Sequence, residues 1–185
     1  MIDCAKNRLL VATPGLVDPN FDRSVVLMLE HDDGGALGLI LNRPGPVPVE
    51  SLFPEWADLA APPPTLFHGG PVAAGAVLTL ALTAEPDAPP EGWVHLFGAV
   101  GVIDIRREPD AAVPAIAAVR IFSGYAGWAA GQLEGEIDAG GWVVVDAVPE
   151  DAFTPDPEGL WSAVLKRQAG WLRVVAACPP DPSTN

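Results

Sequence analysis

The residues that most often do chemistry in proteins are few in this chain and stand far apart. Its three histidines, His31, His68 and His95, show no metal-ligand spacing such as H-x-x-x-H. The two cysteines, Cys4 and Cys178, lie near opposite ends of the sequence and lack such spacing as well. The sequence therefore predicts no metal site and no cofactor.

A serine nucleophile needs a sharp turn and a base within reach. The pattern Gly-x-Ser-x-Gly would require glycines two positions on either side of Ser123, where this chain has Ile121 and Tyr125. We therefore predict no catalytic residue.

His68 is the histidine best placed to meet a ligand. It ends an expected strand at 65–68 and precedes Gly69 and Gly70. A histidine there can face a ligand and titrate near neutral pH. A structural role is the alternative. His31 is followed by two acids and two glycines, so we expect it on an exposed, solvated turn.

The segments 24–30 and 36–41 are typical of two strands that form a hairpin. If the last residue of the first strand lies opposite the first residue of the second, Arg23 lies opposite Arg43. Like charges directly opposed across a sheet are unfavourable. Something is then expected to offset the two guanidinium groups at the open end of this hairpin.

The offset can come from two sources. One is an acid of the adjoining loop, Asp18 or Asp22. The other is a bound anion, which would make this end a ligand pocket with Asn20 and Asn42 as further polar groups.

We expect the rest of the chain to be organised around the stretch 119–137. Residues 119–122 have the branched and aromatic character of a buried strand. A turn is expected at Gly124, and from Ala126 onward apolar residues recur every four positions, which predicts a helix to residue 137. Glycines recur every four positions too, at 127, 131 and 135. Because each glycine costs a helix about 1 kcal/mol relative to alanine, we expect this face to pack closely on the sheet.

Tyr125, Trp128 and Gln132 would share one side of that helix. An aromatic and amide surface of this kind suits the wall of a small-molecule site. A place in the hydrophobic core is the alternative.

Four collinear segments of the chain resemble the AlgH/YqgE family of bacterial proteins. Residues 122–137, Phe-Ser-Gly-Tyr-Ala-Gly-Trp-Ala-Ala-Gly-Gln-Leu-Glu-Gly-Glu-Ile, are similar to the family's hallmark segment. The other segments are 9–26, 34–44 (Gly-Gly-Ala-Leu-Gly-Leu-Ile-Leu-Asn-Arg-Pro) and 68–72 (His-Gly-Gly-Pro-Val). The resemblance implies a strongly bent or branched sheet that closes toward a barrel. The family has carried the label of transcriptional regulator.

Composition narrows the classes of function. A chain of 185 residues fits one domain, 1–185, with a tail at 178–185. Its net charge of −14 opposes direct binding to nucleic acid, which depends on neutralised phosphates. The longest apolar run is too short to span a bilayer and no signal peptide is recognisable, so a cytoplasmic location is expected.

The rest of the sequence predicts further strands and helices. The strongest helix signal covers 157–168, where Asp156 precedes Pro157 and Gly170 follows. A weaker helix is expected at 110–118, and a last edge strand at 171–176. The predicted fold class is α+β, a mixed or mostly antiparallel sheet with flanking helices.

The leading hypothesis is a non-enzymatic binding or regulatory protein of the cytoplasm. We expect it to act through a protein partner or a small anionic ligand rather than by binding DNA directly. One alternative is a hydrolase-type enzyme that uses His68 or the Arg23/Arg43 end. Another is a transcriptional regulator.

Overall fold

The computed structural model describes residues 5–16, 18–85, 88, 90, 92–106 and 115–176. Within them the chain forms ten strands, five short α-helices and one 3-10 helix. The strands are β1 (Arg8–Ala12), β2 (Val25–Asp32), β3 (Gly35–Ile40), β4 (Pro44–Pro48), β5 (Thr65–His68), β6 (Val72–Thr83), β7 (Val94–Phe97), β8 (Val100–Val102), β9 (Ile116–Ala129) and β10 (Trp142–Asp146). The helices are α1 (Val49–Leu52), η1 (Pro54–Leu59), α2 (Gln132–Asp138), α3 (Pro149–Ala152), α4 (Leu160–Lys166) and α5 (Trp171–Val175).

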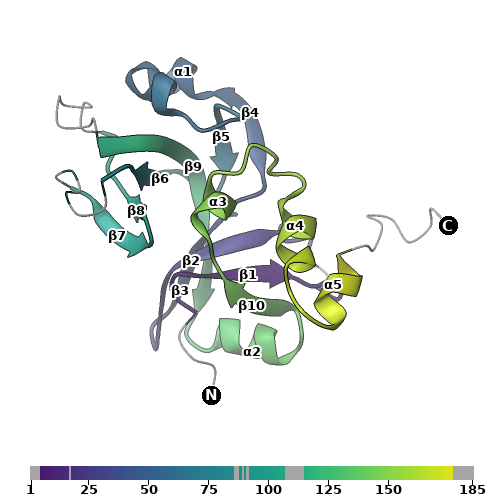
Figure 1. Ribbon diagram of the computed structural model, residues 1–185. Coiled ribbons are helices and arrows are strands. Elements are labelled where there is room, and N and C mark those ends of the chain that lie inside the picture. Colours follow the sequence, from purple (N-terminus) through teal and green to yellow (C-terminus); the bar gives the residue numbers. More distant parts are fainter. Residues whose placement is uncertain are drawn as a thin grey trace.

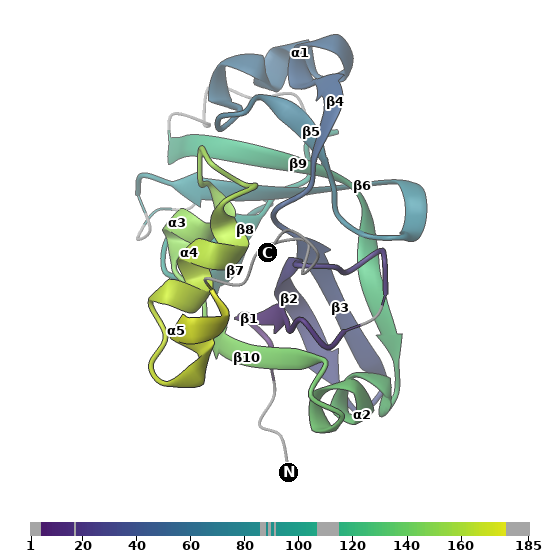
Figure 2. The ribbon, with the colours of Figure 1, turned by 90° about the vertical axis from the view of Figure 1, so that its right-hand side faces the viewer.

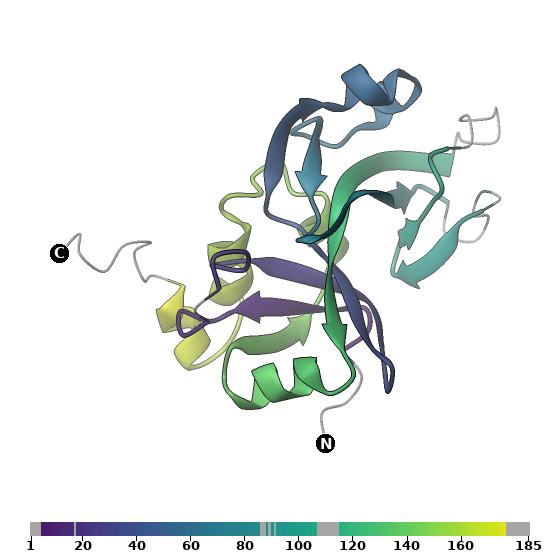
Figure 3. The ribbon, with the colours of Figure 1, turned by 180° about the vertical axis from the view of Figure 1, so that it is seen from behind.

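Strand β9 joins the two halves of the sheet. It pairs with β6 over most of its length, with β3 at its C-terminal end, and in parallel with β5. Gly124, at φ +72°, lies within the strand, and Figure 3 shows β9 bending as it runs from β6 toward β3. The full order is β10-β1-β2-β3-β9-β6-β8-β7, with β4 and β5 attached beside β9. The sheet is mostly antiparallel and curls into a half-barrel, which confirms the predicted α+β class.

The prediction of a helix from Ala126 onward is wrong. The strand continues to Ala129, and α2 begins only at Gln132. A spacing of four is also a multiple of the strand period of two, so it fits a strand with one buried face. Ala126 and Trp128 are indeed buried, whereas Gly127 between them is exposed. Pairing with β3 supplies the backbone hydrogen bonds that the glycine-rich segment would hold poorly as a helix.

The glycines that recur every four positions, at 127, 131 and 135, therefore do not form a packed helix face. A Cβ added to Gly131 or Gly135 would meet nothing within 4 Å, and one added to Gly127 only ordinary contacts. Gly131 instead precedes α2 with a positive φ of 76°. Its conformation, rather than close packing, accounts for the glycine.

The hairpin of β2 and β3 follows the predicted register at its open end only. Val26 lies opposite Ile40, but a bulge after Met28 places Glu30 opposite Leu37 rather than Ala36. The extra residue in β2 shifts the pairing by one toward the turn. Near the open end, Leu41 N–H still donates to the Val25 carbonyl at 2.8 Å.

The helices α3, α4 and α5 lie together beside β1 and β10, whereas α1 and η1 lie at the opposite end of the molecule (Figures 1 and 2). Helix α4 is shorter than the predicted 157–168, but its apolar face packs into the main core. Trp161 anchors it, because the indole Nε1–H donates to the carbonyl of Ala12 at 2.8 Å.

The last predicted edge strand, 171–176, is helical. Gly170 has a φ of 69°, so the chain reverses there and α5 packs back on α4. Ser162 Oγ donates to the carbonyl of Ala176 at 3.0 Å and fixes the end of α5. The predicted helix at 110–118 falls largely outside the described residues, and its end belongs to β9. Cys4, Cys178 and the tail at 178–185 also lie outside them.

Candidate functional site

The two arginines predicted at the open end of the β2–β3 hairpin, Arg23 and Arg43, each contact another part of the fold. Asn42 is buried and joins the strands there, because its Oδ1 accepts from Val25 N–H at 2.9 Å and its Nδ2 donates to the Arg23 carbonyl at 2.8 Å. The Arg23 guanidinium lies 4.5 Å from the centre of the Trp161 ring. Arg43 donates to the backbone carbonyl of Asp22. A tryptophan face thus contacts one of the two guanidinium groups, and a main-chain carbonyl accepts a hydrogen bond from the other.

Asn20 lies in the preceding loop, where its N–H donates to Asp18 Oδ1 at 2.8 Å. This short-range bond is typical of an Asx turn.

His68, Gly69 and Gly70 cross directly over the bend of β9. A Cβ on Gly69 would come within 2.2 Å of the Gly124 carbonyl oxygen, and one on Gly70 within 2.2 Å of the Tyr125 carbonyl carbon. Both glycines are therefore required by the close approach of two backbones. His68 N–H donates to the Arg43 carbonyl at 2.8 Å, so the backbone of this crossing adjoins the hairpin end.

Trp128, near the C-terminal end of β9, and Gln132, at the start of α2, form a cluster with Glu136. The Glu136 carboxylate accepts hydrogen bonds from Trp128 Nε1 at 2.9 Å, Trp142 Nε1 at 2.8 Å and Gln132 Nε2 at 2.9 Å. Phe21 packs against both indole rings. Trp128 is 6% exposed, so it belongs to the core around α2.

His31 does not lie on a solvated turn, contrary to the prediction. It belongs to β2, and its side chain is only 6% exposed. Ala5 N–H donates to Nδ1 at 2.9 Å, and Nε2 lies 3.0 Å from Glu134 Oε1. Because the backbone N–H can only donate, Nδ1 is the acceptor and Nε2 carries the proton toward Glu134.

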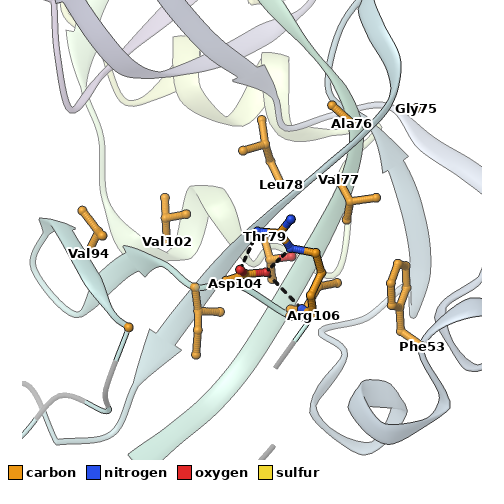
Figure 4. Close-up of a pocket in the computed structure, with 13 residues that line it drawn as sticks. Phe53, Gly75, Ala76, Val77, Leu78, Thr79, Val94, Val102, Asp104 and Arg106 are labelled. Carbon is orange, nitrogen blue, oxygen red and sulfur yellow. Dashed lines mark hydrogen bonds and ion pairs between the residues drawn. The ribbon is translucent and has the colours of Figure 1, made fainter. Parts of the chain in front are cut away.

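The largest of the described cavities lies elsewhere, beside β6. We call it the trough; its volume is about 600 Å³. Figure 4 shows Val77 and Leu78 on one side, Val94 and Val102 on another, and Phe53 opposite. Val77 is 43% exposed and Val94 62%, so apolar side chains face solvent at the trough. The lining residues are Phe53, 75–79, Gly92, Val94 and 102–106.

One ion pair lies in the middle of the trough in Figure 4. Arg106 Nη2 is 2.7 Å from Asp104 Oδ2, and Arg106 Nε donates to Asp104 Oδ1 at 2.9 Å. Thr79 lies deeper, at 1% exposure, and its hydroxyl has no hydrogen-bond partner among the described residues. An unpaired buried hydroxyl costs about 1–3 kcal/mol, so a polar ligand atom that reached it would gain a favourable bond.

None of the site residues predicted from the sequence lines the trough. His68 does not line it, nor either of the two smaller described cavities. Sequence reasoning missed the trough because most of its lining residues are aliphatic residues or glycines, which carry no chemical signature. Among the described residues, no helix is long and apolar enough to cross a membrane.

Comparisons with known proteins place the chain beside a bacterial family. The AlgH-like family model matches residues 9–173. A UPF0301 protein of Streptomyces coelicolor is 50% identical over 181 residues, covering 96% of this chain and 94% of that protein. A UPF0301 protein of Mycobacterium ulcerans is 44% identical over 180 residues, covering 96% and 89% of the two chains.

Two solved structures share the fold. A crystal structure of a protein from Corynebacterium diphtheriae matches with a TM-score of 0.88 and 31% identity, covering 96% of this chain and 94% of that one. The solution structure of the AlgH protein from Pseudomonas aeruginosa matches with a TM-score of 0.68 and 28% identity, covering 97% and 96%.

Proposed function

We propose that this chain, which belongs to the AlgH-like family, is a non-enzymatic binding protein whose site is the trough. The observation that carries the proposal is the size and lining of that cavity. Its volume of about 600 Å³ falls within the roughly 300–1,000 Å³ usual for small-molecule sites. Among its described lining residues, Asp104 is the one acid and Arg106 the one base, and most of the others are apolar.

The lining favours an amphipathic ligand with an anionic group. Its apolar body would cover Val77 and Val94, which face solvent in the structure. Its anionic group would meet Arg106, whose side chain is 87% exposed. Solvent screens an exposed ion pair such as Asp104–Arg106, so exchanging Asp104 for a ligand anion loses little.

The charge of the chain supports a small ligand rather than a nucleic acid. A net charge of −14 opposes the approach of a phosphate backbone. A single anionic group held against an apolar wall meets a smaller repulsion, which the buried apolar area can offset.

A protein partner is the second candidate, and α5 favours it. Trp171 is 59% exposed and Val174 is 73% exposed, and their spacing of three places them on one face of the helix. Exposed tryptophans often anchor protein interfaces. A contact through α5 would be lost with Trp171→Ala and kept with Val77→Asp.

A dye titration tests the trough. The probe is 8-anilinonaphthalene-1-sulfonate, which combines aromatic rings with one anionic group. We expect saturable fluorescence enhancement with the wild type and at least about tenfold weaker binding with Val77→Asp. Val174→Asp is the matched control and should bind as the wild type does. Equal binding by all three proteins, or none by the wild type, would refute the trough as a ligand site.

The non-enzymatic part of the proposal has its own test. A small molecule that copurifies with the protein is extracted, identified, and incubated again with fresh protein. We expect it to be recovered unchanged after prolonged incubation. Its conversion to another compound by the wild type, with no conversion by Val77→Asp, would show an enzyme instead.

A further inference from the structure

A buried arginine in the middle of β9 lacks the partners that a buried charge requires. Arg120 is 2% exposed. Its Nη2 donates to the carbonyls of Pro62 at 2.5 Å and Thr154 at 3.0 Å, and the guanidinium carbon lies 4.3 Å from the centre of the Phe67 ring. Nε and Nη1 are buried and have no acceptor among the described residues.

This arrangement leaves a positive charge uncompensated. Burial lowers the pKa of Arg120 to about 10, so the group keeps its proton at neutral pH. None of its bonds is to a carboxylate within the described part of the chain. Buried charges in proteins are normally paired, because desolvating an isolated ion costs several kcal/mol.

The geometry of the guanidinium group shows how an anion would be held. Each of its two bidentate edges contains Nη2 and one further nitrogen, Nε on one side and Nη1 on the other. Both further nitrogens are the unpaired ones. An oxyanion that replaced one carbonyl at Nη2 would therefore exchange one hydrogen bond to a neutral acceptor for two hydrogen bonds to an anion.

A cavity adjoins Thr154, one of the two residues whose carbonyls bind this group. It has a volume of about 290 Å³ and lies between Leu82 and the segment 149–155, which contains α3; we call it the α3 cavity. Thr154 lines this cavity, and its carbonyl accepts a hydrogen bond from Arg120. The cavity lies on the face of β6 that carries Leu82, a residue packed against the main core. Ala81, its neighbour in β6, faces the separate core beside the trough.

We propose that Arg120 is the receptor for a small oxyanion, a carboxylate or phosphate group, which enters through the α3 cavity and takes the place of the Thr154 carbonyl. The site is independent of the trough. Glu150 also lines the α3 cavity and is exposed, so its carboxylate opposes the incoming anion and weakens binding.

The test follows the buried Nε–H of Arg120 by ¹H–¹⁵N NMR, with the resonance assigned by its loss in Arg120→Lys. Sodium acetate, sodium phosphate and sodium chloride are added separately at equal ionic strength. We expect a saturable shift with acetate, phosphate or both, and none with chloride. The salt that acts identifies the ligand class as carboxylate or phosphate.

Glu150→Gln keeps the proposal testable if changes at Arg120 prevent folding. This variant should bind the active oxyanion about two- to fivefold more tightly, because it removes an opposing charge that solvent partly screens. Glu158→Gln removes another exposed acid, one that does not line the cavity, and it should leave the affinity unchanged. The same small drift with all three salts, or equal affinity in both variants, would overturn the proposal.

Discussion

Asn7 and Leu96, which are 89 residues apart, close the open side of the curled sheet. The Asn7 Nδ2 donates to the Leu96 carbonyl at 2.8 Å, while the Asn7 N–H donates to the Met28 carbonyl at 2.8 Å. Asn7, the residue that directly precedes β1, thus links β2 to β7, which is the last strand in the sheet order. Asn7 has a φ of 63°, a conformation that asparagine tolerates better than most residues.

The closure can be tested with Asn7→Gly, which keeps access to the positive φ and removes only the side-chain bond. We expect a loss of about 1–2 kcal/mol in the free energy of unfolding, because the carbonyl of Leu96, a residue only 8% exposed, loses this donor. Urea denaturation measures it. Unchanged stability would mean that the contact contributes nothing to closing the sheet.

Replacing either of two glycines by alanine should change the free energy of unfolding, in opposite directions at the two positions. Gly70→Ala places a Cβ within 2.2 Å of the backbone at Tyr125 and at a φ of 153°, so we expect a loss of about 2–3 kcal/mol. Gly135→Ala lies within α2 and meets nothing within 4 Å, so we expect a gain of about 0.5–1 kcal/mol. Thermal or urea unfolding of both variants measures the contrast. Destabilisation by Gly135→Ala would show that the glycine face of α2 is packed after all.

The contact between Glu134 and His31 predicts a pH-dependent stability. The pKa of Glu134 lies below its ordinary 4.5, mainly through a backbone hydrogen bond and then through the bond to His31. A depressed carboxyl pKa gives stability that is present above the ordinary pKa and is lost as the pH falls through the folded-state pKa. We expect Glu134→Gln to be less stable than the wild type near neutral pH.

That difference should shrink as the pH drops below 4.5, the ordinary pKa of Glu134. Urea unfolding of both proteins across this range measures it, with Glu158→Gln as a control for removal of an exposed acid. A difference that stays constant down to strongly acidic pH would contradict the assignment to this carboxylate.

Much of the sheet could be predicted from sequence, because its strands are runs of branched apolar residues bounded by turns. The hairpin of β2 and β3 was predicted with the right pairing near its open end. The bulge after Met28 could not be foreseen, since an extra residue in one strand leaves no mark on the apolar pattern. The end of β9 was mistaken for a helix because a spacing of four satisfies both periods.

The candidate sites were harder to predict, for physical reasons. The trough is made by placing Val77, Val94 and Phe53 from distant segments around one space, and no single segment indicates it. Arg120 did leave a signal, since it is a lone charge inside an apolar strand. Its meaning depends on the carbonyls of Pro62 and Thr154, which only the fold brings to it.

The most direct measurement of the central claim maps the bound dye on the protein. ¹H–¹⁵N spectra of the labelled wild type are recorded during titration with 8-anilinonaphthalene-1-sulfonate. We predict that the largest shifts fall on the trough, at Val77, Val94 and Ile103, while α5 and its Trp171 stay nearly unchanged. Shifts confined to Trp171 and Val174, or no shifts at the trough at saturating dye, would contradict the account.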